Sequence, residues 1–263
     1  MGIDIRMDAA RYYDYGPTSP QDLPFYIEHL PSPEAKVLEL GCGTGRVTIP
    51  LSQYCASVRG IDLSSAMISI CREKLLKEEM PETKVKVDVA DITDLDLGQK
   101  YDLIIAPFRV FQNLETDDEV NGFFDSVRRH LTPQGTCILN VFNPNRDRET
   151  MRREWCSEDE ELCWEVMTKG GRVACYDKRA RMDKERMLLY PDLIYRRYED
   201  DILVDEAILK IVMRCWYPQE FEALIEDQGF SILNRWGGYA GETDAGTAYG
   251  EGPELVIQFR GEA

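Results

Sequence analysis

The sequence predicts an α/β fold: a doubly wound, mostly parallel sheet of seven strands with an inserted antiparallel β-meander. Three observations predict it. Up to residue 144, short apolar runs typical of buried strands alternate with helical patterns, the order of consecutive βαβ units. Residues 162–216 instead alternate in segments separated by turn residues, as in an antiparallel meander. A further helical pattern and two strand-like runs follow, and they supply the last two strands of the sheet.

The first elements follow from local pattern. Residues 22–30 have apolar positions at helical spacing behind an acidic candidate N-cap, Asp22, and Pro31 and Pro33 end that helix. Ser64 and Ser65 can cap a later helix. Further helices are expected at 46–55, 65–79 and 117–131, the last ended by Thr132-Pro133-Gln134-Gly135, and strands at 37–40, 58–62, 85–91, 101–108 and 136–144.

The pattern changes after Pro144. Residues 145–161 are charged and predict a loop and a helix, and residues 162–216 predict three or four meander strands. Their breaks fall at Gly170-Gly171, at Asp183-Lys184-Glu185 and at Glu199-Asp200-Asp201. A helix at 218–230 and strands in SILNRWGGY and ELVIQFRG complete the chain. The predicted division is a 1–149 core with a cap segment at 1–34, an inserted lid at 150–216, and a C-terminal part of the core at 217–263.

The composition narrows the possible partners. The net charge of −17 argues against nucleic acid, because a protein that binds polyphosphates needs a basic face. The eight cysteines are scattered without a C-x-x-C pair, so we expect reduced thiols and no metal site. The N-terminus has no apolar signal region, and no apolar run reaches the length of a membrane span. We therefore expect a cytoplasmic protein without a membrane partner.

The stretch VLELGCGTGRVTIPL at 37–51 places three glycines directly after a predicted buried strand. In a doubly wound sheet, ligands bind beyond the carboxyl ends of the strands, where glycines let the backbone approach closely. A dinucleotide site would need a third glycine at position 46, which is Arg46. Asp62 ends the next strand, where a carboxylate can accept hydrogen bonds from a ribose diol, and Asp91 ends the third. This combination predicts an adenosyl ligand that carries no phosphate.

Five segments in order resemble the motifs of class I S-adenosylmethionine (SAM)-dependent methyltransferases of the small-molecule type. They are ELGCGTGR, GIDLSSAMI, DVADITDLDL, YDLIIAPFRVFQNL and VRRHLTPQGTCILNVF, and the resemblance covers about residues 37–144. The resemblance implies SAM as the cofactor. It also implies the following cofactor site. The methionine portion is lined by Gly41, Cys42, Gly43 and Gly45, and the ribose and adenine are faced by Asp62, Leu63 and Met67. The adenine edge is held by Asp91 and Ile92, and beneath the sulfonium lie Ala106, Pro107 and Phe108.

Two further residues have resemblance-based roles near the cofactor. The pair Tyr12-Tyr13 resembles an N-terminal segment that closes over the cofactor in small-molecule members, which makes Tyr13 a cofactor-site candidate. Arg46 has two interpretations of equal weight: it approaches the methionine carboxylate, or it caps the glycine loop.

The predicted reaction is methyl transfer to an unidentified small molecule, on nitrogen or oxygen. Ala106-Pro107-Phe108-Arg109 stands where DNA and glutamine amino-methyltransferases carry an Asn/Asp-Pro-Pro-aromatic tetrad, which disfavours a planar amide acceptor. In outline the inserted meander resembles the lids of glycine, sarcosine and amino-sugar N-methyltransferases. Candidate acceptor-site residues are Phe111, Gln112, Tyr195, Arg197, Arg214, Trp216, Tyr217 and Tyr239.

Several alternatives stay open at this level. For Trp216 and Tyr217, the favoured interpretation is that of hydrophobic joints between lid and core. The arginines along 172–197 are typical of a solvated strand face, and an anionic-substrate pocket or a homodimer interface through the lid are the other interpretations. His29 and His130 are expected to be structural, so no catalytic residue is assigned. A non-catalytic SAM-binding or partner-binding protein is the second functional hypothesis, and an NAD-dependent oxidoreductase, which Arg46 disfavours, is the third.

Overall fold

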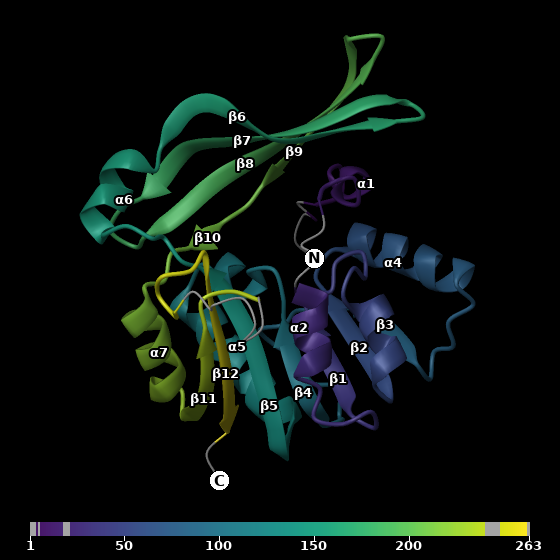
Figure 1. Cartoon of the computed structure of the whole chain (residues 1–263), viewed down its shortest axis with the longest axis vertical. Coiled ribbons are helices and arrows are strands. Elements are labelled where there is room, and N and C mark those ends of the chain that lie inside the picture. Colours follow the sequence, from purple (N-terminus) through teal and green to yellow (C-terminus); the bar gives the residue numbers. More distant parts are fainter. Residues whose placement is uncertain (1–3, 5, 18–21, 240–247, 262–263) are drawn as a thin grey trace.

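The computed structural model describes residues 4, 6–17, 22–239 and 248–261. It contains two β-sheets, with the larger sheet and its helices below and the smaller sheet above (Figure 1). The larger sheet has seven strands in the order β11-β12-β5-β4-β1-β2-β3. Neighbouring strands from β5 to β3 pair in parallel, and β12 is antiparallel to β5 and to β11. The predicted fold class, a mostly parallel seven-stranded sheet with an antiparallel insertion, is confirmed.

The elements of this larger sheet agree closely with the predicted ranges. Its strands are β1 (Lys36–Leu40), β2 (Ser57–Asp62), β3 (Val85–Val89), β4 (Tyr101–Ala106), β5 (Leu131–Phe142), β11 (Phe230–Trp236) and β12 (Glu254–Gly261). One difference lies at β5, which begins at Leu131 rather than at residue 136. Residues 132–135, predicted as a turn, form an irregularity in the pairing of β5 with β4. Proline and glycine interrupt the ladder there without ending the strand.

Helices cover both faces of this sheet because the strands are apolar on both sides. Residues of α5 and α7 pack on one face around Phe123, Phe124 and Phe221. Residues of α2 and α3 pack on the other face, and α4 continues that layer. The helices and 3₁₀ turns are α1 (Ala10–Tyr13), α2 (Asp22–Glu28), α3 (Thr48–Leu51), η1 (Ser52–Tyr54), α4 (Ser65–Lys77), η2 (Val110–Asn113), α5 (Asp117–His130), α6 (Arg148–Glu154) and α7 (Pro218–Asp227).

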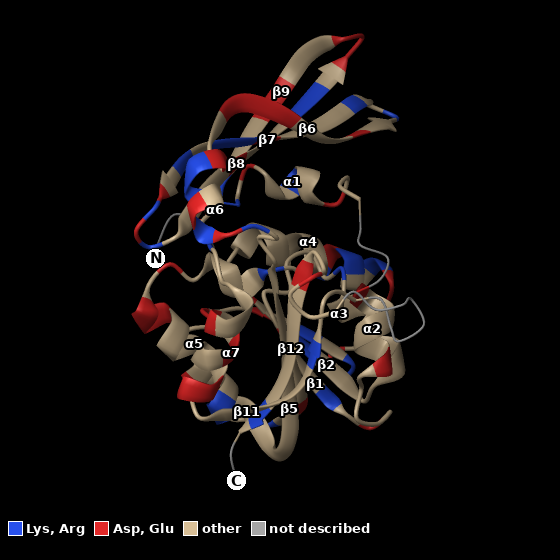
Figure 2. Ribbon diagram, turned by 60° about the vertical axis from the view of Figure 1, so that its left-hand side comes forward, with Lys and Arg blue, Asp and Glu red and all other residues tan. Residues whose placement is uncertain are grey.

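The smaller sheet is formed by one continuous stretch of chain between β5 and α7, here called the lid. Its strands are β6 (Ser157–Thr168), β7 (Gly171–Asp183), β8 (Leu188–Glu199), β9 (Ile202–Lys210) and β10 (Met213–Arg214). They pair antiparallel, with β8 bonded to β7 on one side and to β9 and β10 on the other. The strand breaks fall where the sequence predicts them. Four acidic residues, 158–161, form a continuous run in β6 (Figure 2).

The N-terminal segment lies between the lid and the core, with α1 under the lid (Figures 1 and 2). On the lid side, the Tyr12 hydroxyl and the Arg11 guanidinium donate to Asp205 of β9. On the core side, Asp14 accepts a hydrogen bond from Thr44 Oγ1 at 2.7 Å and pairs with Lys74 Nζ at 2.8 Å. These contacts hold residues 6–17 across the space where the two sheets meet.

No helix in the described part of the chain is long and apolar enough to cross a membrane. All eight cysteines fall in the described ranges, and each has a free thiol. His130 is buried, where its Nε2 accepts the Leu97 N–H at 2.9 Å, while His29 Nδ1 lies 2.7 Å from the Phe25 carbonyl. Both histidines therefore contact nearby backbone groups, as expected for structural residues.

Candidate functional site

Two adjoining cavities open at the carboxyl ends of the parallel strands, below the lid. The larger has a volume of about 460 Å³ and the smaller about 200 Å³. Residues from three strand ends or the turns after them border both cavities, among them Gly41, Asp62 and Val110. The larger cavity extends up to the lid, and the smaller one extends along the end of β3. This is the position that the strand order predicts for a ligand.

The glycine loop after β1 gives the larger cavity its backbone wall. The N–H groups of Gly41 and Cys42 both donate to the Ile61 carbonyl, at 2.7 and 2.9 Å, which fixes the loop on the neighbouring strand. Gly41 and Gly43 adopt positive φ angles of 77° and 54°. A Cβ atom on Gly43 would meet no atom within 4 Å, so the loop presents bare backbone to open space there. A ligand can therefore approach the backbone directly.

Asp62 lies at the junction of the two cavities. Its Oδ2 accepts the Gly43 N–H and its Oδ1 accepts the Ser64 N–H, both at 2.8 Å. These bonds hold the carboxylate in one orientation, and each oxygen keeps a second lone pair for another donor. A group with two adjacent hydroxyls that spans the junction would meet an acceptor already in place. The structure thus puts Asp62 at the crevice, as the ribose assignment requires.

The smaller cavity is bordered by Leu63, Asp91 and Ile92. Leu63 exposes 64% of its surface and offers an apolar face to a flat ring. Asp91 Oδ1 accepts the Thr93 N–H at 2.8 Å and its hydroxyl at 2.7 Å, so the turn after β3 is fixed. An apolar wall beside a fixed carboxylate suits a heteroaromatic ring that carries an amino group.

The turn after β4 is strained. Phe108 and Arg109 have consecutive positive φ angles of 55° and 65°, a conformation that non-glycine residues rarely adopt. The Arg109 N–H donates to Asn140 Oδ1, and the Arg109 guanidinium pairs with Glu254, which stabilises the turn. As a result, Phe108 projects at the cavity with 53% of its surface exposed. Strain of this kind at a cavity indicates a functional position.

Arg46 borders the larger cavity and forms a two-bond ion pair with Asp22, at 2.8 and 2.6 Å. Asp22 is fully buried. Burial lowers the pKa of Arg46, but the bonds to Asp22 outweigh that effect and the pKa is raised. The guanidinium carbon also lies 5.4 Å from the centre of the Phe108 ring. The pair therefore fastens the glycine loop to α2, in agreement with the loop-capping interpretation.

Every predicted cofactor-site residue except Gly45 and Ala106 borders one of the two cavities. A Cβ on Gly45 would lie 2.5 Å from Cys71 Sγ, so this glycine serves close packing of the loop against α4. Ala106 is fully buried in the core. The cavity-bordering predicted residues are Tyr13, Gly41, Cys42, Gly43, Arg46, Asp62, Leu63, Met67, Asp91, Ile92, Pro107 and Phe108.

Glu39 is a residue that the sequence reasoning passed over. It lies on β1, borders the larger cavity, and is almost fully buried, with the Thr48 hydroxyl donating to its Oε2. Burial raises the pKa of Glu39 to about 8, and Thr48 and Arg46 oppose that rise. Its position two residues before Gly41 is the sequence feature that could have identified Glu39 as a site residue.

We predict that Glu39 makes the protein less stable as the pH rises. Its carboxyl is protonated in both states below its unfolded pKa of 4.5, and only the unfolded chain releases the proton between that value and about 8. Glu39→Gln should remove this dependence. The unfolding free energy of the variant relative to wild type should rise with pH across this window, by at most about 1.4 kcal/mol per unit. Urea unfolding at several pH values measures it, and parallel pH profiles for the two proteins would refute the prediction.

The roof of the larger cavity comes from the lid. It is mainly apolar, and its polar members are Cys163, Asp177 and Arg179. Arg179 Nε lies 3.3 Å from Asp177 Oδ2, and its Nη2 pairs with Glu161 of β6. Burial raises the pKa of Asp177, and the Arg179 charge opposes that rise. The apolar roof residues are Trp155, Leu189, Pro191, Leu193, Leu209, Ile211 and Met213.

None of the eight predicted acceptor-site residues borders this cavity. Phe111 and Trp216 pack together in the core beneath it, with ring centres 6.1 Å apart. Gln112 is fully buried and ties β5 to the lid, because it accepts the Phe142 N–H and donates to the Arg214 carbonyl. Tyr217 packs beneath α6. For Trp216 and Tyr217, the hydrophobic-joint interpretation describes what the structure shows.

The remaining acceptor candidates also have partners elsewhere. Tyr195 stacks on Tyr12, with ring centres 5.8 Å apart, and Tyr239 packs on Phe25 and Tyr26. Arg197 pairs with the neighbouring Glu199. The Tyr195 side chain thus contacts the N-terminal segment, Tyr239 packs on the core, and Arg197 forms its ion pair on the lid surface.

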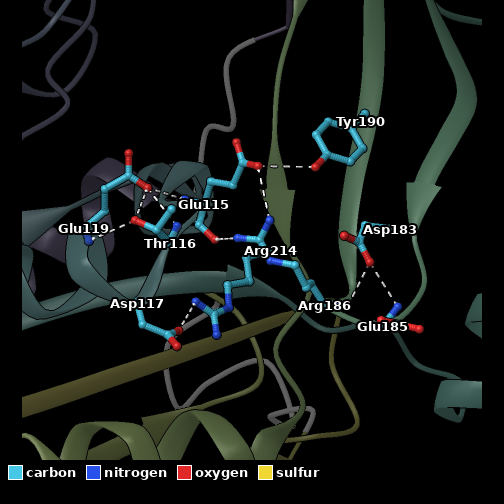
Figure 3. A network of polar contacts seen from close by, with 9 residues as sticks. All are labelled: Glu115, Thr116, Asp117, Glu119, Asp183, Glu185, Arg186, Tyr190 and Arg214. Atoms are coloured by element: carbon cyan, nitrogen blue, oxygen red, sulfur yellow. Dashed lines mark hydrogen bonds and ion pairs between the residues drawn. The ribbon is translucent and has the colours of Figure 1, made fainter.

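Arg214 joins the lid to the core. It pairs with Asp117 at the start of α5, at 2.7 Å, and Figure 3 shows the two side chains in contact. Close by, Arg186 donates to the Glu115 carbonyl and Tyr190 to the Glu115 carboxylate. This network ties the β7–β8 turn and the lid exit to the segment before α5.

An adenosyl ligand fits the residues present. The bare backbone at Gly43, the exposed apolar faces of Leu63 and Phe108, and the oriented Asp62 carboxylate surround two joined spaces of suitable polarity. The arrangement can hold a nucleoside at the junction and a second, more apolar molecule below the lid.

Part of the chain is similar in sequence to known methyltransferases. Residues 37–135 match the family model described as "Methyltransferase domain". A malonyl-[acyl-carrier protein] O-methyltransferase of Priestia megaterium is 34% identical, over 41% of this chain and 37% of its own length. A dTDP-4-amino-2,3,4,6-tetradeoxy-D-glucose N,N-dimethyltransferase of Saccharopolyspora spinosa is 32% identical, over 41% of each chain. The chain thus spans less than half the length of these two relatives.

Solved structures match over nearly the whole chain. The CcbJ methyltransferase of Streptomyces caelestis has a TM-score of 0.78 at 22% identity, covering 99% of this chain and 98% of its own. SAM-bound CalS10, an amino pentose methyltransferase of Micromonospora echinaspora, has a TM-score of 0.69 at 19% identity and covers 95% of both chains. At such identities these matches establish that the core and the inserted lid share one fold with those proteins.

Proposed function

We propose that the protein transfers a methyl group from SAM to a small-molecule acceptor, on nitrogen or oxygen, because residues 37–135 match the model described as "Methyltransferase domain". The predicted resemblance to this family and the predicted fold class are confirmed, and the domain match supports SAM as the cofactor. The observation that carries the proposal is the position of Asp62, at the junction of two cavities beside a bare glycine loop.

The proposed roles of the cavity residues follow from the geometry. SAM supplies a methyl group on a positively charged sulfur. Asp62 would hold the ribose, and Leu63, Asp91 and Ile92 would hold the adenine in the smaller cavity. The glycine loop would lie along the methionine portion. Phe108 and the lid exclude water and align the acceptor, which is the main contribution a protein makes to an in-line displacement.

A small acceptor is supported by the lid residues that form a roof over the larger cavity. The two relatives described above are named for an O-methylation and an N,N-dimethylation, so both atoms stay within the proposal. The net charge of −17 still disfavours nucleic acid. The division into core and lid, a homodimer through the lid and a cytoplasmic location stay predictions. A non-catalytic SAM-binding role is the alternative, which SAM calorimetry followed by turnover on a metabolite panel would separate.

We predict that Asp62→Ala weakens SAM binding by about 1.5–3 kcal/mol, the contribution of hydrogen bonds to a charged group. Isothermal titration calorimetry measures the loss. Asp88→Ala is the matched control: Asp88 lies on the adjacent strand β3 and pairs with Arg59, and it borders neither cavity. This control should bind SAM as wild type does. Equal affinities for wild type and Asp62→Ala would refute the ribose role, and absence of SAM binding to wild type would refute the proposed function.

A further inference from the structure

Four residues form a row across the inner face of the lid. Asp177 on β7 pairs with Glu161 of β6 and with Leu193 of β8, and Leu193 pairs with Leu209 of β9. Directly paired residues of antiparallel strands lie on the same face of a sheet. Asp177, Leu193 and Leu209 all border the larger cavity. The row therefore places a carboxylate next to an apolar wall, on the side of the lid that faces the cofactor site.

Asp177 and Arg179 each keep a buried polar atom without a hydrogen bond, although Arg179 Nε lies within ion-pair range of Asp177 Oδ2. Asp177 Oδ1 and Arg179 Nε are buried and make no hydrogen bond within the described part of the chain. A buried carboxylate oxygen without a donor is costly. Both atoms belong to cavity-bordering residues but are themselves buried, so a molecule in the cavity meets the rest of the Asp177 carboxylate.

The charges at this position favour a donor that is positive. Two carboxylates, Glu161 and Asp177, share the single guanidinium of Arg179, which leaves one negative charge over. Three further arginines border the same cavity. Arg46 and Arg109 are each paired with a carboxylate of their own, Asp22 and Glu254, and Arg6 donates to Asn113 Oδ1 on the core side. An anionic acceptor would have to compete with those contacts. A cationic acceptor would balance the excess negative charge that Glu161, Asp177 and Arg179 leave on the lid.

From this arrangement we propose that the Asp177 carboxylate binds the acceptor, and that the acceptor carries an ammonium group on an apolar body. A nitrogen that is to be methylated would first pass its proton to that carboxylate, which frees the lone pair for the methyl group. The inference rests on the proposed function, because it places the acceptor in the cavity that holds the methyl donor. Leu189, Leu193, Leu209 and Ile211 surround the apolar body. Arg179 is a positioning residue, whose Nε lies 3.3 Å from Asp177 Oδ2 and keeps the carboxylate beside the cavity. The carboxylate selects amines over alcohols of the same shape.

The test compares benzylamine with benzyl alcohol as probes of equal shape. Both are titrated by calorimetry into the full chain saturated with S-adenosylhomocysteine, so that no turnover occurs. Wild type should bind benzylamine at least about tenfold more tightly than benzyl alcohol, as expected for a charged hydrogen bond. Asp177→Asn should lose this preference, and Asp177→Glu should keep part of it. Asp159→Asn removes the same charge from an exposed position of β6, and it should retain the wild-type preference.

Three results would overturn the inference: benzylamine fails to bind to wild type, the two probes bind equally, or Asp177→Asn keeps the preference. Circular dichroism and thermal unfolding check that each variant is folded, and Asp177→Glu, which keeps the charge, gives a second reading if the asparagine variant is unstable. The S-adenosylhomocysteine titration distinguishes a failure of this inference from a failure of the proposed function. Binding of S-adenosylhomocysteine without an amine preference removes this inference alone, whereas no binding of it removes the proposed function as well.

Discussion

Replacing Gly41 by alanine is expected to weaken SAM binding more than about thirtyfold. The added Cβ would lie 2.3 Å from Val110 Cγ2 and 2.6 Å from Cγ1, distances that force the loop or η2 to move. The positive φ of 77° adds a strain of about 1–2 kcal/mol for any residue with a Cβ. Overpacking of this kind costs about 1–3 kcal/mol more. Calorimetry with SAM and thermal unfolding together measure how that cost divides between binding and stability.

Gly43→Ala is the matched control for this prediction. Gly43 also has a positive φ, 54°, but a Cβ there would meet nothing within 4 Å. It should therefore suffer the backbone strain without a collision inside the protein, and its loss of thermal stability should be the smaller one. Because the colliding atoms are the Val110 methyl groups, the double variant Gly41→Ala/Val110→Ala should recover part of the lost stability and affinity. A loss of stability at Gly43 equal to that at Gly41, or no recovery in the double variant, would contradict the steric explanation.

Arg46→Met is expected to lower the free energy of unfolding by about 3–5 kcal/mol, the usual cost of leaving one member of a buried ion pair alone. The arginine side chain is 20% exposed, but its partner Asp22 is only 1% exposed and would lose both hydrogen bonds. Urea unfolding followed by fluorescence measures the change. Asp22→Asn added to Arg46→Met should restore part of the stability, because the amide is far less costly to bury than an unpaired carboxylate.

Arg59→Met is a suitable control for that experiment. Arg59 is also 20% exposed and pairs with Asp88 at 2.9 Å, but Asp88 is 30% exposed and stays hydrated when its partner is removed. This variant should lose no more than about 1 kcal/mol. If both arginine variants lost the same amount, burial of the partner would not be the reason for the effect at Arg46.

The parallel core could be predicted from the sequence because its signals are local. Runs such as 101–106 are apolar throughout, as strands covered on both faces must be, and prolines and glycines separate them from their helices. The lid strands followed from turn residues such as Gly170 and Asp200. The β5 start was missed, because residues 132–135 have turn composition but bulge within a strand that the neighbouring β4 holds in place. Tertiary pairing there outweighs local preference.

The cofactor half of the site was predictable for a related reason: Gly43, Asp62 and Asp91 each follow a strand end, and parallel strands bring those ends together. The acceptor half was not, because it depends on which face of each lid strand points inward. Alternation shows that Asp177 and Lys178 lie on opposite faces, but it does not say which face is covered. That choice is made by the pairing of distant strands and by contact with Tyr12. Their aromatic character made residues such as Phe111 acceptor-site candidates, but the Phe111 side chain packs in the hydrophobic core.

The lid leaves the core after β5 and returns before α7 as a single excursion, so one contiguous segment supplies the roof while other parts of the chain supply the nucleoside-facing floor. Its replacement leaves the order of the seven core strands untouched. Under the proposed function, exchange of the lid alone would therefore change the roof of the acceptor space and leave Gly41, Asp62 and Asp91 on the core.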